Sequence, residues 1–197
     1  MNFLAHTYLS GSDPEILVGN FIGDFVKGKQ IEKFEENIQN GIRLHREIDL
    51  FTDTHKIHLK SRSRLKATYR HYSGVIVDMY YDHFLAANWS NYSTMDLLTY
   101  TLDVYKILNN HHHILPGRAQ EMLKYMIPAN WLYYYSKIEG IHRALEGMSR
   151  RTKFESGMEN ASEDLRKHYE EFQNEFELFF PGLISFTQTF DFIKYIH

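Results

Sequence analysis

His45 and Asp49 are the first residues of this sequence that could do chemistry together, because they are four residues apart in a stretch with helical periodicity. Read as one helix, residues 41–55 and the turn before them place both side chains on a stripe with Ile38 and Ile42, the face expected to be buried. An ionised carboxylate buried without a partner is costly, so such a pair is hydrogen-bonded, ion-paired or bound to a metal. This stretch alone fits a structural His–Asp hydrogen bond as well as it fits a functional site.

Three further carboxylates fall on the apolar stripes of predicted helices. Asp24 follows Leu17 and Phe21 on one stripe, and Asp78 and Asp82 share the apolar face of another helix. Buried networks of this acidity need counter-charge, which a divalent cation supplies. Nitrogen and oxygen ligands without sulfur suit a hard or borderline cation such as Mn²⁺, Fe²⁺ or Mg²⁺.

The elements that position these residues are predicted to be helices throughout. Four prolines and eleven glycines are few for 197 residues, which favours long helices over a turn-rich β fold. We therefore predict an all-α fold, with a single helical domain over residues 1–197. The predicted helices cover residues 2–9, 14–27, 32–51, 56–72, 75–88, 94–110, 138–149 and 162–179, with one more beginning at Pro116. A final aromatic-rich segment follows Pro181 and Gly182.

Local signals support the second of these helices. Asp13 suits the N-cap and Pro14 the first helical position. Gly19 and Gly23 lower helix propensity, which is expected where another element must approach closely.

Composition narrows the classes of function. The absence of cysteine excludes disulfides, thiolate metal sites and a cysteine nucleophile. A net charge of −3 gives no overall case for nucleic-acid binding. No apolar run approaches the roughly 18 residues of a membrane span, and the N-terminal residues do not form a signal peptide. We therefore expect an intracellular, cytoplasmic protein with no nucleic-acid or membrane partner.

Residues 56–72 are unusually basic. They contain no acidic residue, and none occurs between Thr54 and Val77. A charge run is usually a solvated face, but an uncompensated one in an acidic protein predicts a docking surface for an anionic partner. The basic residues are Lys56, Lys60, Arg62, Arg64, Lys66 and Arg70.

Several common catalytic signatures are missing from the sequence. It contains no phosphate-binding glycine loop, no serine nucleophile elbow and no HExxH motif. Hydrolysis at a metal held by histidine and aspartate therefore remains as the favoured chemistry.

Five motifs resemble those of the acyl carrier protein phosphodiesterases. They are NFLAH at residues 2–6, GN..GDFVKG at 19–28, GI..HR.ID..TD at 41–53, D..YDHFL at 78–85, and Trp131 with GMSRR at 147–151. The resemblance implies an altered form of the fold of the HD-domain metal phosphohydrolases. It also implies a Mn²⁺-dependent release of 4′-phosphopantetheine from the serine of holo acyl carrier protein, which would be the partner and substrate.

The resemblance also implies roles for individual residues. The implied metal-centred set is His6, Asp24, His45, Asp49 and Asp82, of which Asp24 and His45 are the implied catalytic residues. The order Asp82-His83 reverses the His-Asp order usual in HD domains, so roles from that fold do not transfer directly. An acidic carrier protein would suit the basic stretch. The substrate-binding candidates are Arg46, Lys60, Arg62, Arg64, Lys66, Arg70 and Arg150.

Two other hypotheses remain open from the sequence. One is a phosphohydrolase acting on a nucleotide or another small phosphate ester. The other is a non-enzymatic helical binding protein in which the buried histidines and aspartates form a structural network. The extended basic stretch favours a protein substrate over a small one, and the number of carboxylates on apolar stripes favours an enzyme over a binding protein.

Overall fold

The structure, a computed structural model, describes residues 1–190, and every regular element in that range is a helix. The predicted all-α fold class is therefore confirmed, while the end of the predicted aromatic-rich segment, residues 191–197, lies outside the described residues. The α-helices are α1 (Phe3–Tyr8), α2 (Pro14–Ile22), α3 (Glu36–Thr54), α4 (Lys56–Tyr69), α5 (Ser73–Ala87), α6 (Leu97–Asn110), α7 (Gly117–Met126), α8 (Trp131–Tyr134), α9 (Ile138–Ser149), α10 (Ala161–Lys167) and α11 (Tyr169–Gln188). The 3₁₀ helices are η1 (Gly23–Phe25), η2 (Gly28–Lys33), η3 (Arg70–Tyr72), η4 (Trp89–Asn91), η5 (His112–Ile114) and η6 (Met158–Asn160).

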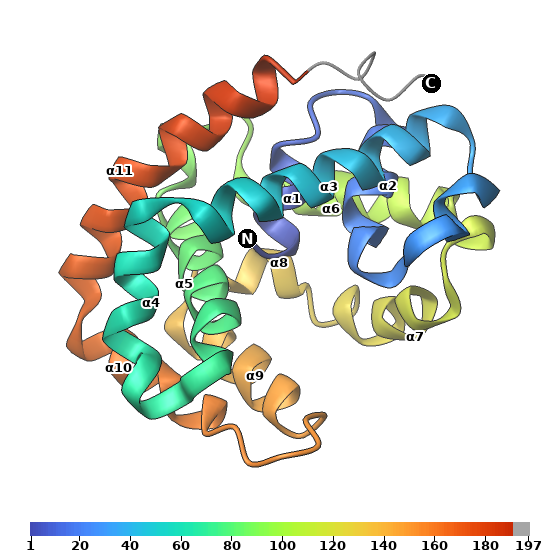
Figure 1. Ribbon diagram of the computed structural model, residues 1–197. Helices are drawn as coiled ribbons and strands as arrows, with labels where there is room; N and C mark the ends of the chain where they lie inside the picture. The colour runs from blue at the N-terminus through green and yellow to red at the C-terminus, as the bar shows by residue number, and fades with distance from the viewer. Residues whose placement is uncertain (191–197) are drawn as a thin grey trace.

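Helix α3 crosses the middle of the molecule and organises the helices around it (Figure 1). Helix α2 packs along α3, whereas α4, α5 and α11 form a group beyond its C-terminal end. The short helix α1 contacts both α2 and α5, so it links these two parts of the fold. Within residues 1–190, no helix is both long enough and apolar enough to cross a bilayer.

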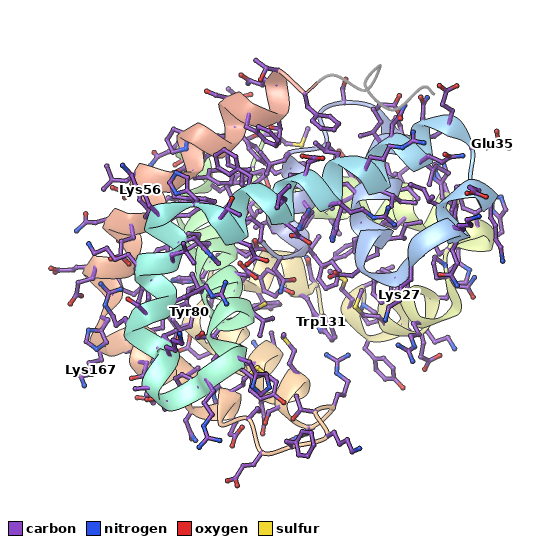
Figure 2. The ribbon with its side chains drawn as sticks, viewed as in Figure 1. Lys27, Glu35, Lys56, Tyr80, Trp131 and Lys167 are labelled. Carbon is purple, nitrogen blue, oxygen red and sulfur yellow. The ribbon has the colours of Figure 1, made fainter. Side chains whose placement is uncertain are left out.

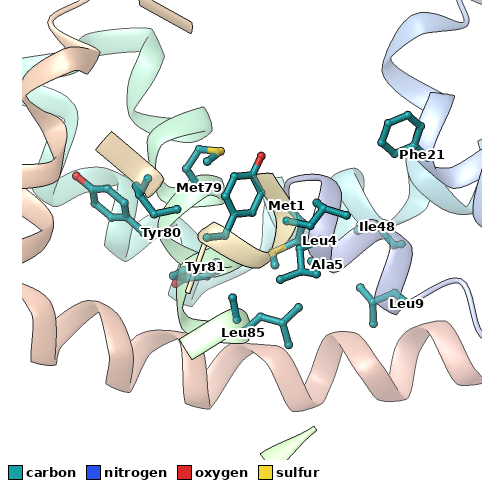
Figure 3. Close-up of a cluster of buried hydrophobic side chains, with 14 of the residues drawn as sticks. Met1, Leu4, Ala5, Leu9, Phe21, Ile48, Met79, Tyr80, Tyr81 and Leu85 are labelled. Atoms are coloured by element: carbon teal, nitrogen blue, oxygen red, sulfur yellow. The ribbon is translucent and has the colours of Figure 1, made fainter. Parts of the chain in front are cut away.

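Aromatic side chains fill much of the core between α5 and α11. Tyr81 on α5 meets the rings of Phe176 and Phe179 on α11 at centroid distances of 5.6 and 5.3 Å. Leu4 and Ala5 of α1 are fully buried near Leu85 of α5, as Figure 3 shows. Burying large aromatic and aliphatic side chains is the dominant favourable term in folding, so this cluster holds α1 in place against α5.

Glycines allow α2 and α3 to approach closely, as the sequence predicted for Gly19. A Cβ atom at Gly19 would lie 2.1 Å from the carbonyl oxygen of Ile38, and one at Gly41 would lie 2.2 Å from that of Ile16. The predicted start of α2 is also confirmed, because the Asp13 side chain accepts hydrogen bonds from the N–H groups of the first turn.

Two predicted helix boundaries were wrong in the region around α3. Helix α2 ends at Ile22 rather than near residue 27, and the 3₁₀ turn η1 follows it. Helix α3 begins at Glu36 rather than near residue 32, because residues 28–33 form η2, whose first residue, Gly28, has a φ of +51°. Helical periodicity does not distinguish 3₁₀ turns from the ends of α-helices.

The predicted helix over 162–179 was also wrong. The segment contains two helices, α10 and α11, and α11 continues through Pro181 to Gln188. A proline inside a helix costs about 3 kcal/mol, since it removes a backbone hydrogen bond. Phe179, Phe180 and Leu183 are all fully buried on either side of it, so their packing outweighs the local cost.

A buried ion pair joins α4 to α11. Arg64 donates two hydrogen bonds, of 2.7 and 2.8 Å, to the two carboxylate oxygens of Glu175, and Ser61 donates a third of 2.6 Å. Burial disfavours the charge of Glu175, but these donors and Lys60 outweigh that effect and hold the pKa of Glu175 below its ordinary value. Part of the positive charge of the basic stretch is therefore neutralised by an acid more than a hundred residues later.

The α2–α3 contact predicts the effect of a single methyl group. Gly41→Ala should lower the free energy of unfolding by about 1–3 kcal/mol, the usual cost of overpacking, because the new Cβ would overlap the Ile16 carbonyl. Urea unfolding followed by circular dichroism would measure this change. Gly117→Ala is the control, since a Cβ at Gly117 has no atom within 4 Å. Equal loss of stability in both variants would contradict the close approach.

Candidate metal centre

His6, His45 and Asp49 come together from α1 and α3. Each offers one ligand atom, and these three atoms all lie within 4.8 Å of one another. Asp49 lies between the two histidines, with one carboxylate oxygen 3.3 Å from His6 Nε2 and the other 3.2 Å from His45 Nε2. The two imidazole rings are stacked with centroids 4.0 Å apart.

Asn20 fixes the orientation of both imidazole rings. The Nδ1 atom of His6 lies 2.8 Å from the Asn20 side-chain oxygen, and the Nδ1 atom of His45 lies 2.7 Å from the Asn20 backbone oxygen. Both partners only accept, so each Nδ1 atom donates a proton and each Nε2 atom faces Asp49. The Asn20 amide nitrogen donates to the His6 carbonyl and to Ser10, which sets the direction of its own side chain.

The chemistry of this donor set fits a divalent cation. Among the described residues, His6 Nε2 and His45 Nε2 are buried and make no hydrogen bond, although carboxylate oxygens lie 3.2–3.4 Å away. Two histidines held by Nδ1–H donation and one carboxylate form a usual ligand set for borderline metals. His6, His45 and Asp49 could therefore hold such an ion.

The pKa values of the histidines and aspartates are shifted because several charged groups lie close together at this site. Burial lowers the pKa of His45, but Asp24 and Asp49 outweigh it and raise that pKa to about 9. Burial and the charge of His45 lower the pKa of His6 to about 4. Burial acts against ionisation of Asp49, yet the two histidines hold the pKa of Asp49 well below its ordinary value. Without a cation, a proton on His45 and the ammonium group of Met1, which lies 3.8 Å from Asp49, offset part of the carboxylate charge. A bound cation would replace the His45 proton.

Asp24 lies at the solvent-facing edge of this group. It belongs to η1, where one of its oxygens is 3.4 Å from His45 Nε2, and its side chain is 69% exposed. Gly23 makes this position possible, because a Cβ there would lie 2.2 Å from the His45 ring. The structure thus brings together four of the five residues of the implied metal set: His6, Asp24, His45 and Asp49.

Asp82 lies apart from these four and has other contacts. Its carboxylate accepts hydrogen bonds from the backbone N–H groups of Asn2, Leu4 and Ala5, at 3.1, 2.8 and 3.4 Å. It therefore caps α1 and fixes the helix that carries His6. Burial raises the pKa of Asp82 to about 7. The neighbouring His83 contacts the Tyr135 carbonyl and the Tyr169 hydroxyl instead of this group.

A cavity of about 420 Å³ opens beside the four residues. One end is polar and includes His6, Asp24, His45, Asp49, Asp53 and Asp78. The lining also contains a set of apolar side chains, here called the apolar wall: Val75, Met79, Met122, Trp131, Tyr135, Ala144 and Met148. Arg151 lines the same cavity. Trp131 is labelled near the centre of Figure 2. A cavity with a charged end and an apolar wall suits an amphipathic ligand.

Two of the predicted substrate-binding arginines, Arg46 and Arg150, do not line the cavity. Arg150 pairs with Glu146 at 2.7 Å on the surface, and it is the adjacent Arg151 that lines the cavity. Arg46 is exposed and donates to the Val26 carbonyl, outside the cavity lining. Sequence reasoning assigned no role to Asn20 or Arg151. Asn20 had a signal, a polar residue among apolar ones, whereas Arg151 had none to distinguish it from Arg150.

The basic residues of α4 have different neighbours. Lys60 and Arg64 pair with Glu175, and Arg62 pairs with Asp53 at the polar end of the cavity. Three of the predicted residues line one open surface groove, together with the half-exposed Leu59. These three are Arg62, Lys66 and Arg70.

Comparison with known proteins identifies the family of this chain. The sequence profile of the family described as acyl carrier protein phosphodiesterase matches residues 1–183. A protein of that name from Photorhabdus laumondii is 31% identical over 193 residues, which cover 98% of this chain and 98% of the relative. Another from Yersinia enterocolitica is 31% identical over 192 residues, covering 95% and 98%, and one from Escherichia coli is 30% identical over 190 residues, covering 94% and 96%.

These findings place the chain among the phosphodiester hydrolases. It belongs to the acyl carrier protein phosphodiesterase family. The resemblance drawn from the sequence motifs is therefore confirmed at the level of the family, and the hypothesis of a non-enzymatic binding protein is wrong. No solved structure matches the chain, so its likeness to HD-domain proteins stays a prediction.

The donor set predicts metal binding that can be measured without substrate. Mn²⁺ at 100 times its dissociation constant should stabilise the folded protein by about 2.7 kcal/mol, which is roughly 5–10 °C in melting temperature. Asp49→Asn should abolish this shift, because it removes the carboxylate between the two histidines. Differential scanning fluorimetry would measure it, with Asp103→Asn on the exposed face of α6 as the control. The same shift in both variants would exclude Asp49 as a ligand.

Proposed function

We propose that this enzyme hydrolyses the phosphodiester that joins 4′-phosphopantetheine to the serine of a holo acyl carrier protein, with Mn²⁺ or a similar divalent cation. The names of the relatives support the carrier protein as substrate. The observation that carries the metal dependence is the pair of buried Nε2 atoms without hydrogen bonds, held on either side of Asp49 at the polar end of the cavity.

His6, His45 and Asp49 would hold the cation, and Asp24 would lie at its open side. A cation there would polarise the phosphoryl oxygens and lower the pKa of a water molecule. The residues of the chain supply the geometry. Asn20 keeps both histidines in one tautomer, and Asp82 fixes the helix that carries His6.

Asp24 is the residue we assign to proton transfer or to water orientation. Its carboxylate is exposed to the cavity, and its nearest charged neighbour in the group is His45. The nearby His45 imidazole lowers the pKa of Asp24, so its carboxylate is ionised at neutral pH and can accept a proton from an attacking water. His45 supports both roles, since it contacts Asp24 and Asp49 through one nitrogen.

The carrier protein would dock on the groove of α4. Acyl carrier proteins are acidic, and Lys66 and Arg70 face this groove without an ion pair among the described residues. Arg62 connects the groove to the cavity through its 3.2 Å pair with Asp53. Such a surface favours a protein substrate over a nucleotide or another small phosphate ester, because a small ester needs only the cavity.

Removing either catalytic candidate should abolish turnover. Asp24→Ala and His45→Ala should each lower kcat by at least about a hundredfold, in line with the usual contribution of general acid–base groups. Mass spectrometry of holo acyl carrier protein incubated with enzyme and Mn²⁺ would detect the loss of phosphopantetheine, and circular dichroism would verify the fold. Turnover in both variants at the wild-type rate would contradict the assignment of Asp24 and His45 as catalytic residues.

Reversing a charge in the groove should affect encounter with the carrier protein. Lys66→Glu should raise KM for holo acyl carrier protein several-fold and change kcat little, because rim charges act mainly on association. Lys106→Glu makes the same change on the exposed face of α6 and is the matched control. Arg64 is a poor choice for this test, since its loss would leave the buried Glu175 unpaired. An equal KM for both variants would place the docking surface elsewhere.

A further inference from the structure

A second, smaller cavity adjoins the first. It has a volume of about 100 Å³ and lies between α8, α9 and the segment before α8. It shares Trp131, Tyr135, Ala144 and Arg151 with the main cavity, so these four residues lie where the two cavities meet. We call this smaller cavity the annex.

Two glycines of α9, Gly140 and Gly147, line the annex. A Cβ at Gly140 would lie 1.9 Å from the Tyr134 carbonyl oxygen, so α8 and α9 are packed tightly at that point. Gly147, two residues before the end of α9, also lines the annex, and a Cβ there has no atom within 4 Å. The backbone at Gly147 therefore has room for a larger side chain beside the annex.

The chemistry of the annex suits an uncharged group with a polar neighbour. Among the described residues, its lining contains aromatic and small side chains, two arginines and no acid. Arg143 is held over the Tyr134 ring at 5.3 Å. Arg151 donates from Nε to the Gly147 carbonyl at 3.0 Å, and its two terminal nitrogens make no hydrogen bond or ion pair within residues 1–190.

We propose that the annex binds the thiol end of the pantetheine arm, and that Gly147 determines how large a group is accepted there. This inference rests on the proposed function. With the phosphate at the His/Asp group, the arm would run along the apolar wall towards Trp131 and Tyr135. The arm is uncharged, with two amides and an aliphatic backbone, so it matches an apolar channel with few polar groups. The free nitrogens of Arg151 lie where an amide carbonyl of the arm would pass.

A larger side chain at residue 147 tests this proposal, because it should occupy the annex. In Gly147→Leu, the ratio of kcat/KM for holo acyl carrier protein to that for bis(p-nitrophenyl) phosphate should fall at least about tenfold, because the small diester has no arm to place in the annex. Leucine is a better helix former than glycine, so the variant should fold. Gly117→Leu is the matched control, because it makes the same change at an open site outside both cavities. An unchanged ratio in Gly147→Leu overturns the proposal.

A binding measurement separates the annex from the proposed reaction. The chain has two tryptophans, and only Trp131 lines the cavities, so pantetheine should change its fluorescence. Trp131→Phe identifies the source of the signal. If the wild type fails to hydrolyse holo carrier protein, the proposed function is wrong. The pantetheine binding measurement then tests the annex independently of the reaction. Binding that is lost in Gly147→Leu supports the annex, and equal binding in the two proteins overturns it.

Discussion

The hydrogen bonds of Asn20 are the interaction on which the candidate metal centre depends. Its side-chain oxygen binds one histidine and its backbone oxygen binds the other, although these histidines lie on different helices. Because both Nδ1 atoms are committed to Asn20, both Nε2 atoms face Asp49, and His45 Nε2 also lies 3.4 Å from Asp24. The Asn20 side chain is fully buried, so neither water nor a rotamer change competes with this arrangement. The electrostatics of the site follow from this geometry, including the opposite pKa shifts of His6 and His45.

The close contact between α2 and α3 places Asn20 where it can make these bonds. Gly19 and Gly41 let the two backbones meet, and Gly23 leaves room for the His45 ring. At the other end of the site, Asp82 fixes the start of α1 through three backbone N–H groups. Three aspartates therefore serve the site in two different ways. Asp49 and Asp24 contact the histidines directly, whereas Asp82 positions the helix that carries one of them.

Much of this arrangement could be predicted from the sequence, because helical periodicity is a local signal. It correctly placed His45 and Asp49 on one face of α3, predicted the start of α2 at Asp13, and indicated close packing at Gly19. Of these two α3 residues only His45 is buried, however, whereas the Asp49 side chain is 40% exposed. Features set by tertiary contacts could not be predicted. Arg150 and Arg151 differ only in which side of the end of α9 they face, and the acid that neutralises Arg64 comes from a distant helix. The contacts of Asp82 were also hidden, since its partners are backbone groups of another helix.

The Arg64–Glu175 pair has a consequence for how the protein responds to ionic strength. Salt at physiological concentration screens exposed charges over about 8 Å, but it screens buried pairs much less. The Glu175 side chain is 4% exposed, so α4 should stay attached to α11 as salt is added. Under the same conditions, salt screens the exposed cations in the groove, Lys66 and Arg70, and shortens the distance over which they attract opposite charge. One helix thus combines a salt-resistant anchor with a salt-sensitive surface, so added salt weakens the field of the groove without loosening the fold.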